Sequence, residues 1–154
     1  MFVIVNDRVD RSFPYGVRVD RSGRRPKTVL DIDVPQAITV LVVEDEPIIR
    51  MDIVDQLEDL GFKTFQAANA SEALILIEAN SDIQVIFTDV DMPGGMDGLK
   101  LAAMVRDRWP PIKIIVTSGH RQVGLSDLPA ESRFFSKPYT GEAVASALRE
   151  MAAI

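Results

Sequence analysis

Four short runs, three of them mainly apolar, are each followed by a polar side chain, and this pattern most restricts the possible folds. The runs span residues 39–43, 84–88, 112–116 and 133–136, and they are followed by Glu44-Asp45, Asp89, Thr117 and Lys137. Apolar runs of this length, rich in Val and Ile, are typical of strands buried on both faces of a parallel sheet. The carboxyl ends of parallel strands meet at one edge, so we expect these five side chains to lie close together.

Helical patterns separate the runs. Pro47 suits the first turn of a helix, and Gly61 is a natural stop after its last turn. A further strand is expected over 62–67. Three more helices are expected, one from a cap at Asn69 or Ser71 to Asn80, one over 98–108 and one over 141–152. This alternation predicts an α/β fold, a doubly wound parallel sheet with helices on both faces joined by right-handed crossovers.

One connection departs from this alternation. The segment 118–132 contains Gly119, Gly124 and Pro129, which leave room for at most two helical turns. We therefore expect a short or irregular fourth helix.

The first 37 residues show no sustained periodicity. We expect an N-terminal extension, mostly irregular, over 1–37 and a single domain over 38–154. Repeats of valine with charged residues near Val9 and Val17 could pair as a short hairpin. Residues 1–38 hold seven basic and five acidic residues, a net charge of +2, whereas the remainder holds ten basic and eighteen acidic, a net charge of −8.

The composition narrows the classes of function. An acidic body repels phosphate backbones, so we expect no nucleic-acid binding. No apolar stretch approaches the roughly 20 residues of a membrane helix, so we expect no membrane association. The absence of cysteine favours a cytoplasmic location.

The clustered groups predict phosphoryl chemistry. Crowded carboxylates repel one another, and Mg²⁺ relieves that repulsion because it prefers oxygen ligands and keeps some waters. Phosphoryl transfer needs positioning and positive charge, which Mg²⁺ and the Lys137 ammonium would supply. Thr117 can donate a hydrogen bond to a phosphoryl oxygen, and Asp89 would be the nucleophile. Each residue alone has a plainer interpretation, such as a helix cap, a turn or a solvated amine.

The motifs as a set resemble the receiver domain of two-component response regulators, and in particular the single-domain chemotaxis receiver. The resemblance covers about residues 38–153. It is carried by the sequences VLVVEDEP at 40–47, TDVDMP at 88–93 with MDGL at 96–99, VTSG at 116–119 and FFSKPY at 134–139.

The resemblance implies a flavodoxin-like fold with five strands in the order 2-1-3-4-5. It also implies that Asp89 is phosphorylated by a sensor histidine kinase or a histidine phosphotransfer protein. Asp45, Asp89 and the Asp91 carbonyl would then bind Mg²⁺, with Glu44 reaching it through water. The Lys137-Pro138 peptide bond would be cis.

The same resemblance implies a switch between Thr117 and Phe134. Phosphorylation would draw Thr117 towards the phosphoryl group, and Phe134 would fill the space it leaves. We expect a receiver without an output domain, which would catalyse only its own phosphorylation and dephosphorylation. It would act by docking onto a downstream protein, whose identity the sequence leaves open, or by onward transfer.

Two features depart from the family's pattern. Two glycines, Gly94 and Gly95, stand where one residue is usual before Met-Asp-Gly, and the segment 118–132 is short. The first could alter partner contacts or phosphate lifetime, and the second puts a standard helix-four output surface in doubt.

Two other functions stay open. The segment 86–91 also resembles the Asp-x-Asp motif of haloacid-dehalogenase phosphatases, although there the motif comes near the start of the chain. The chain could also be a degenerate receiver that only binds partners, against which the intact Asp45, Asp89, Thr117 and Lys137 argue.

Overall fold

The computed structural model describes residues 9–10, 17–18, 36–92, 94–119 and 123–153. The chain divides into two compact units, Met1–Gln36 and Ala37–Ile154. In the first unit, β1 (Val9–Asp10) pairs antiparallel with β2 (Val17–Arg18), as the valine repeats suggested. The rest of the expected extension, residue 36 and Ala37 apart, lies outside the described residues, so its predicted irregular character stays a prediction.

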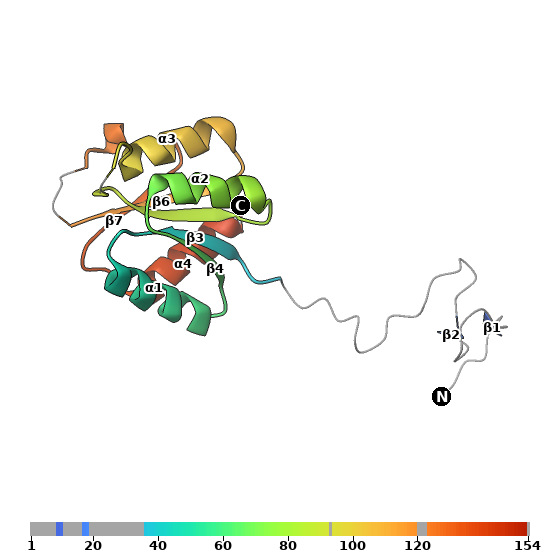
Figure 1. Cartoon of the computed structure of the whole chain (residues 1–154). Coiled ribbons are helices and arrows are strands. Elements are labelled where there is room, and N and C mark those ends of the chain that lie inside the picture. The colour runs from blue at the N-terminus through green and yellow to red at the C-terminus, as the bar shows by residue number, and fades with distance from the viewer. Residues whose placement is uncertain (1–8, 11–16, 19–35, 93, 120–122, 154) are drawn as a thin grey trace. The chain divides into compact units, whose positions relative to one another are not determined.

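The second unit is built on a parallel sheet. Its strands are β3 (Thr39–Val43), β4 (Lys63–Ala67), β5 (Val85–Asp89), β6 (Lys113–Ser118) and β7 (Arg133–Ser136). They lie in the order β4-β3-β5-β6-β7, and every neighbouring pair is parallel (Figure 1). Counted along this unit the order is 2-1-3-4-5, so the predicted flavodoxin-like topology is confirmed.

Helices cover both faces of the sheet. α2 (Ala70–Ala79) and α3 (Gly98–Arg108) pack on one face over a core that includes Leu41, Ile86 and Ile114. α1 (Pro47–Asp59) and α4 (Gly141–Ala152) pack on the other, over Val42, Phe87 and Ile115 (Figure 1). Alternate residues of the three central strands, β3, β5 and β6, thus enter opposite cores, as expected of a sheet buried on both faces. None of the helices described here is long and apolar enough to cross a membrane.

The connection between β6 and β7 holds no full helix among its described residues. Only a 3₁₀-helix, η2 (Leu125–Asp127), forms there, so the predicted short or irregular fourth helix is confirmed. His120, which we expected to be a solvated loop residue, lies outside the described residues.

The strand boundaries differ from the predictions by one or two residues. Asp89 is the last residue of β5, and Thr117 and Ser118 belong to β6. Asp89 pairs in register with Thr117, and the N–H of Val90 donates to the Thr117 carbonyl at 2.9 Å. The backbone ladder therefore continues past the apolar runs, which an apolar pattern does not reveal. Phe62, expected in a strand, precedes β4.

Gly98 fixes the approach of α3 to β5. Its N–H donates to the Val90 carbonyl at 2.9 Å, and a Cβ at this position would overlap the backbone carbonyl of Asp89. The neighbouring N-cap, Asp97, accepts from the N–H of Lys100 at 2.9 Å. The absence of a side chain at Gly98 thus lets the helix begin directly against the residue at the centre of the site.

We expect Gly98→Ala to destabilise the protein by about 1–3 kcal/mol, because backbone atoms must move to admit the methyl group. Gly95→Ala is the matched control, because a Cβ at Gly95 meets nothing within 4 Å, and it should change stability by less than about 0.5 kcal/mol. Urea unfolding of both variants measures the difference. Equal stabilities would show that the close approach of α3 to β5 is not needed.

Candidate functional site

The carboxyl ends of four neighbouring strands bring the predicted site residues together. Glu44 follows β3, Asp89 ends β5, Thr117 lies in β6 and Lys137 follows β7. Glu44, Asp89 and Thr117 are buried, with exposed fractions of 2%, 4% and 0%. The convergence expected of parallel strands that end at one edge of the sheet is therefore present for these four residues.

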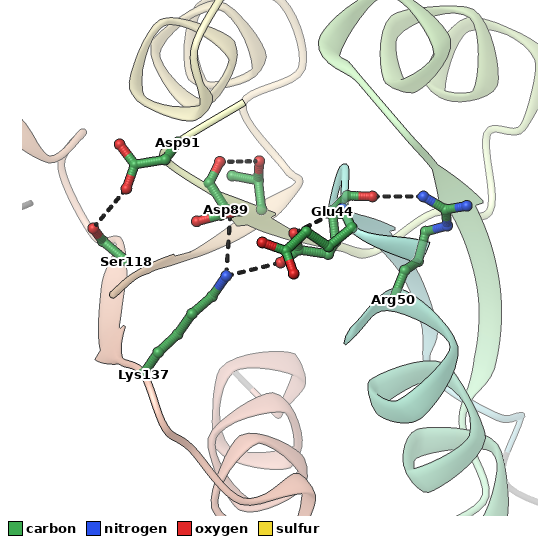
Figure 2. Close-up of polar contacts among 8 residues, drawn as sticks. Glu44, Arg50, Asp89, Asp91, Ser118 and Lys137 are labelled. Atoms are coloured by element: carbon green, nitrogen blue, oxygen red, sulfur yellow. Dashed lines mark hydrogen bonds and ion pairs between the residues drawn. The ribbon is translucent and has the colours of Figure 1, made fainter. Parts of the chain in front are cut away.

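Lys137 forms ion pairs with two buried carboxylates. Its Nζ lies 3.0 Å from Glu44 Oε2 and 3.2 Å from Asp89 Oδ2 (Figure 2). Its backbone N–H donates to the Ser118 carbonyl at 3.0 Å, and the Lys137-Pro138 bond is cis, as predicted. The lysine after the edge strand thus reaches across β6 to the Asp89 carboxylate on β5.

The acidic groups outnumber this ammonium. Carboxylate oxygens of Glu44, Asp45 and Asp89 lie within 4.8 Å of one another. Lys137 is paired with two of these three carboxylates, so the acidic groups exceed the ammonium that faces them in a largely buried place. Among the described residues, Asp89 Oδ1 has no hydrogen-bond partner. Clustered carboxylate oxygens, one of them buried and unpartnered, fit a hard divalent cation such as Mg²⁺.

The electrostatics of the site follow from burial and crowding. Burial raises the pKa of Asp89 above its ordinary value, and the Lys137 charge only partly opposes this. Burial also raises the pKa of Glu44; the Lys137 hydrogen bond opposes the rise, and the nearby Asp89 charge adds to it. Burial acts to lower the pKa of Lys137, but the hydrogen bond that Lys137 donates to Glu44 and the charges of both carboxylates outweigh it, so this pKa rises.

Thr117 offers a second unsatisfied group. Its Oγ1 is buried and has no hydrogen-bond partner in the described part of the chain. Because an unpaired buried hydroxyl costs free energy, its presence beside Asp89 needs a reason. A hydroxyl at this point can donate to an oxygen atom that arrives next to Asp89.

Asp91 and Phe134 lie at the margins of the site. The Asp91 side chain is exposed and accepts a hydrogen bond from Ser118 Oγ at 3.4 Å (Figure 2). Its carboxylate is not part of the cluster that Glu44, Asp45 and Asp89 form. Phe134 is partly buried, pairs in register with Val116 and packs against the core beneath α2 and α3. The predicted roles of the Asp91 carbonyl and of Phe134 stay predictions.

Three contacts of the site were not anticipated from the sequence. Arg50 Nη1, in α1, donates to the Glu44 carbonyl at 2.7 Å (Figure 2). Gln56 Oε1 accepts from the N–H of Gly141 at 3.1 Å, which ties α1 to the start of α4. Tyr139 packs edge-on against Phe87, with ring centroids 5.4 Å apart, and burial raises its pKa to about 12. For the contact of Arg50, the only signal in the sequence was an arginine one turn into the helix that follows the acidic pair.

Known proteins are similar to this chain in sequence and in fold. The family model of the response regulator receiver domain matches residues 40–149. The chain is 36% identical over 123 residues to the sensor kinase CckA of Brucella abortus (strain 2308), a match that covers 77% of this chain and 13% of that protein. It is 32% identical over 117 residues to the positive alginate biosynthesis regulatory protein of Pseudomonas aeruginosa, covering 73% of this chain and 46% of that one. The chain thus spans less than half the length of these relatives.

Solved structures agree. A response regulator receiver protein from Sinorhizobium medicae WSM419 superposes with a TM-score of 0.71 at 25% identity, covering 78% of this chain and 98% of that one. The receiver domain of the Francisella response regulator 1452 superposes with a TM-score of 0.68 at 26% identity, covering 75% and 97%. Because the family model matches most of this chain, residues 40–149, the chain belongs to the response regulator receiver domain family.

Proposed function

We propose that this receiver domain accepts a phosphoryl group on Asp89 and signals through the change that follows. Membership of the family supports phosphorylation-dependent signalling in a two-component system, and a signalling switch in place of a classical enzyme. The observation that supports Asp89 as the acceptor is its environment. Asp89 is buried, is paired through Oδ2 with Lys137, and its Oδ1 has no partner among the described residues.

The chemistry assigned to each residue follows from its position. In the proposed step an Asp89 oxygen attacks phosphorus, a phosphorus–oxygen bond forms, and the bond to the donor's leaving group breaks. Lys137 faces the carboxylate and would hold the added negative charge. Thr117 would donate its unpaired hydroxyl to a phosphoryl oxygen.

A divalent cation fits the same site. Glu44, Asp45 and Asp89 would hold Mg²⁺, together with the Asp91 carbonyl that the family's pattern implies. When bound, Mg²⁺ would neutralise part of the negative charge of the phosphoryl group during transfer. Glu44 is the least available of the three, because both of its carboxylate oxygens already accept hydrogen bonds, from the Glu46 N–H and from Lys137. This supports contact between Glu44 and the cation through water.

The phosphoryl donor and the downstream partner can be proposed only as classes of protein. We propose a sensor histidine kinase or a histidine phosphotransfer protein as the donor, consistent with the sensor kinase among the relatives. The signal would leave by docking onto another protein or by onward transfer, with Thr117 and Phe134 as the switch pair. A cytoplasmic location stays a prediction from composition.

Incubation with acetyl phosphate and Mg²⁺ should add one phosphoryl group to the chain, as measured by intact mass. Asp89→Asn should abolish the gain, because the amide is a poor nucleophile. Asp107→Asn, an exposed change near the end of α3, should leave the gain intact. Unphosphorylated wild-type protein under conditions where a known receiver is modified would favour a binding-only domain.

The raised pKa of Asp89 gives stability a definite dependence on pH. The folded state binds this proton more tightly than the unfolded state does, so the Asp89 contribution to stability falls as pH rises from the ordinary 3.8 through the folded value. Without Mg²⁺ at neutral pH, Asp89→Asn should therefore have the higher Tm. The difference should narrow as pH falls towards about 4.

The control for this comparison is Asp82→Asn. Asp82 is exposed, and its hydrogen bond with Lys63 lowers its pKa, so the sign is opposite and this variant should gain no stability. Thermal unfolding between pH 4 and 8 measures all three proteins. An Asp89→Asn variant less stable than wild type at neutral pH would show that Lys137 already compensates the buried charge.

A further inference from the structure

The geometry points to a role for Arg50 that the phosphoryl chemistry does not itself require. We propose that Arg50 is a positioning residue, whose guanidinium holds the Glu44-Asp45 turn in the conformation that binds the divalent cation. The inference rests on the proposed function, because it concerns affinity at that same site.

Glu44 is held at each of its polar groups. Its N–H donates to the Ala67 carbonyl at 3.1 Å, and its carbonyl accepts from Arg50 Nη1 at 2.7 Å. Its Oε1 accepts from the Glu46 N–H at 3.2 Å and its Oε2 from Lys137 Nζ at 3.0 Å. Four contacts, from β4, from the start of α1 and from the loop after β7, thus fix the residue that follows β3.

The contact from Arg50 differs from the other three. It is the shortest of the four, and like the Lys137 contact it has a charged donor, which makes a hydrogen bond roughly twice as strong as a neutral one. It acts on the carbonyl that joins Glu44 to Asp45, so it restrains the peptide unit between two of the three clustered carboxylates. Asp45 is only partly buried, so few neighbouring atoms hold its side chain. Fixing the peptide unit before Asp45 restricts the orientations that its carboxylate can take.

The start of α1 supports the same contact. Glu46 is the N-cap of α1 but its side chain makes no capping hydrogen bond, and Pro47 follows at the first helical position. Arg50 N–H donates to the Glu46 carbonyl at 2.9 Å in the first turn, and the Arg50 side chain folds back to Glu44. Helix and loop are therefore joined by a single residue, one turn after the acidic pair (Figure 2).

Two effects of Arg50 on cation affinity have opposite signs. A positive charge near a carboxylate cluster repels a cation, so its loss alone would raise Mg²⁺ affinity. A restraint on the ligand turn raises affinity, so its loss would lower it, and outer residues of this kind typically change metal affinity by 10–100-fold. Because Arg50 donates to a carbonyl instead of pairing with a clustered carboxylate, we expect the second effect to dominate.

The test is calorimetric titration of Mg²⁺ into wild-type protein, Arg50→Met and the control Arg108→Met. Arg108 is an exposed arginine at the end of α3, so the control loses the same charge far from the acidic turn. We expect the Kd for Mg²⁺ to rise about tenfold in Arg50→Met and to stay within about twofold in the control. An unchanged or lower Kd in Arg50→Met would overturn the proposal.

A second readout needs no metal. In ¹⁵N-labelled protein without Mg²⁺, the Glu46 amide reports its bond to Glu44 Oε1, and the Lys100 amide reports its bond to the Asp97 cap. Arg50→Met should shift the first signal and leave the second in place. If Arg50→Met does not fold, Arg50→Gln, with a shorter neutral donor, should change both readouts in the same direction.

The two readouts separate this inference from the proposed function. If wild-type protein binds no Mg²⁺ but the Glu46 signal still shifts in the variant, the proposed metal site is contradicted. The restraint that Arg50 places on the turn is then still supported. Normal Mg²⁺ binding with no change in either readout would contradict the role of Arg50 alone.

Discussion

The ion pairs of Lys137 with Glu44 and Asp89 set the character of this receiver domain. They join the loop after the edge strand β7 to the ends of β3 and β5, at 3.0 and 3.2 Å. One ammonium cannot balance the three clustered carboxylates, and burial raises the pKa of Glu44 and of Asp89. A site with such an excess of negative charge is poised to bind a cation and then an electrophile, which is the chemistry we propose for Asp89.

The fold positions these charged groups through a few close contacts between its helices and its sheet. Gly98 brings α3 against the Asp89 backbone, Gln56 ties α1 to the start of α4, and Arg50 ties α1 to the Glu44 carbonyl. The contacts of Gly98 and Arg50 each join a helix to a strand end that carries a site residue, and the contact of Gln56 joins two helices. The same helices bury the two faces of the sheet, so core packing and site geometry depend on the same elements.

Much of this arrangement was predictable from local pattern. The boundaries of α3 and α4 follow from glycines and helical spacing, and the strand order and the group of Glu44, Asp89, Thr117 and Lys137 follow from the receiver motifs. The exact ends of β5 and β6 could not be predicted, because backbone pairing continues beyond the apolar residues. The contacts of Arg50 and Gln56 were also missed, since each reaches a backbone group outside its own helix and, unlike a helix cap, follows no regular spacing in the sequence.

We propose that Asp89 lies in an acidic site whose negative charge Lys137 only partly compensates and that a divalent cation completes. The most direct measurement is the titration of the Asp89 carboxyl carbon by ¹³C NMR, with and without Mg²⁺. We predict a pKa above the ordinary 3.8 in metal-free protein and a clear fall when Mg²⁺ is added. An Asp89 carboxyl that titrates near 3.8 and does not respond to Mg²⁺ would contradict the account.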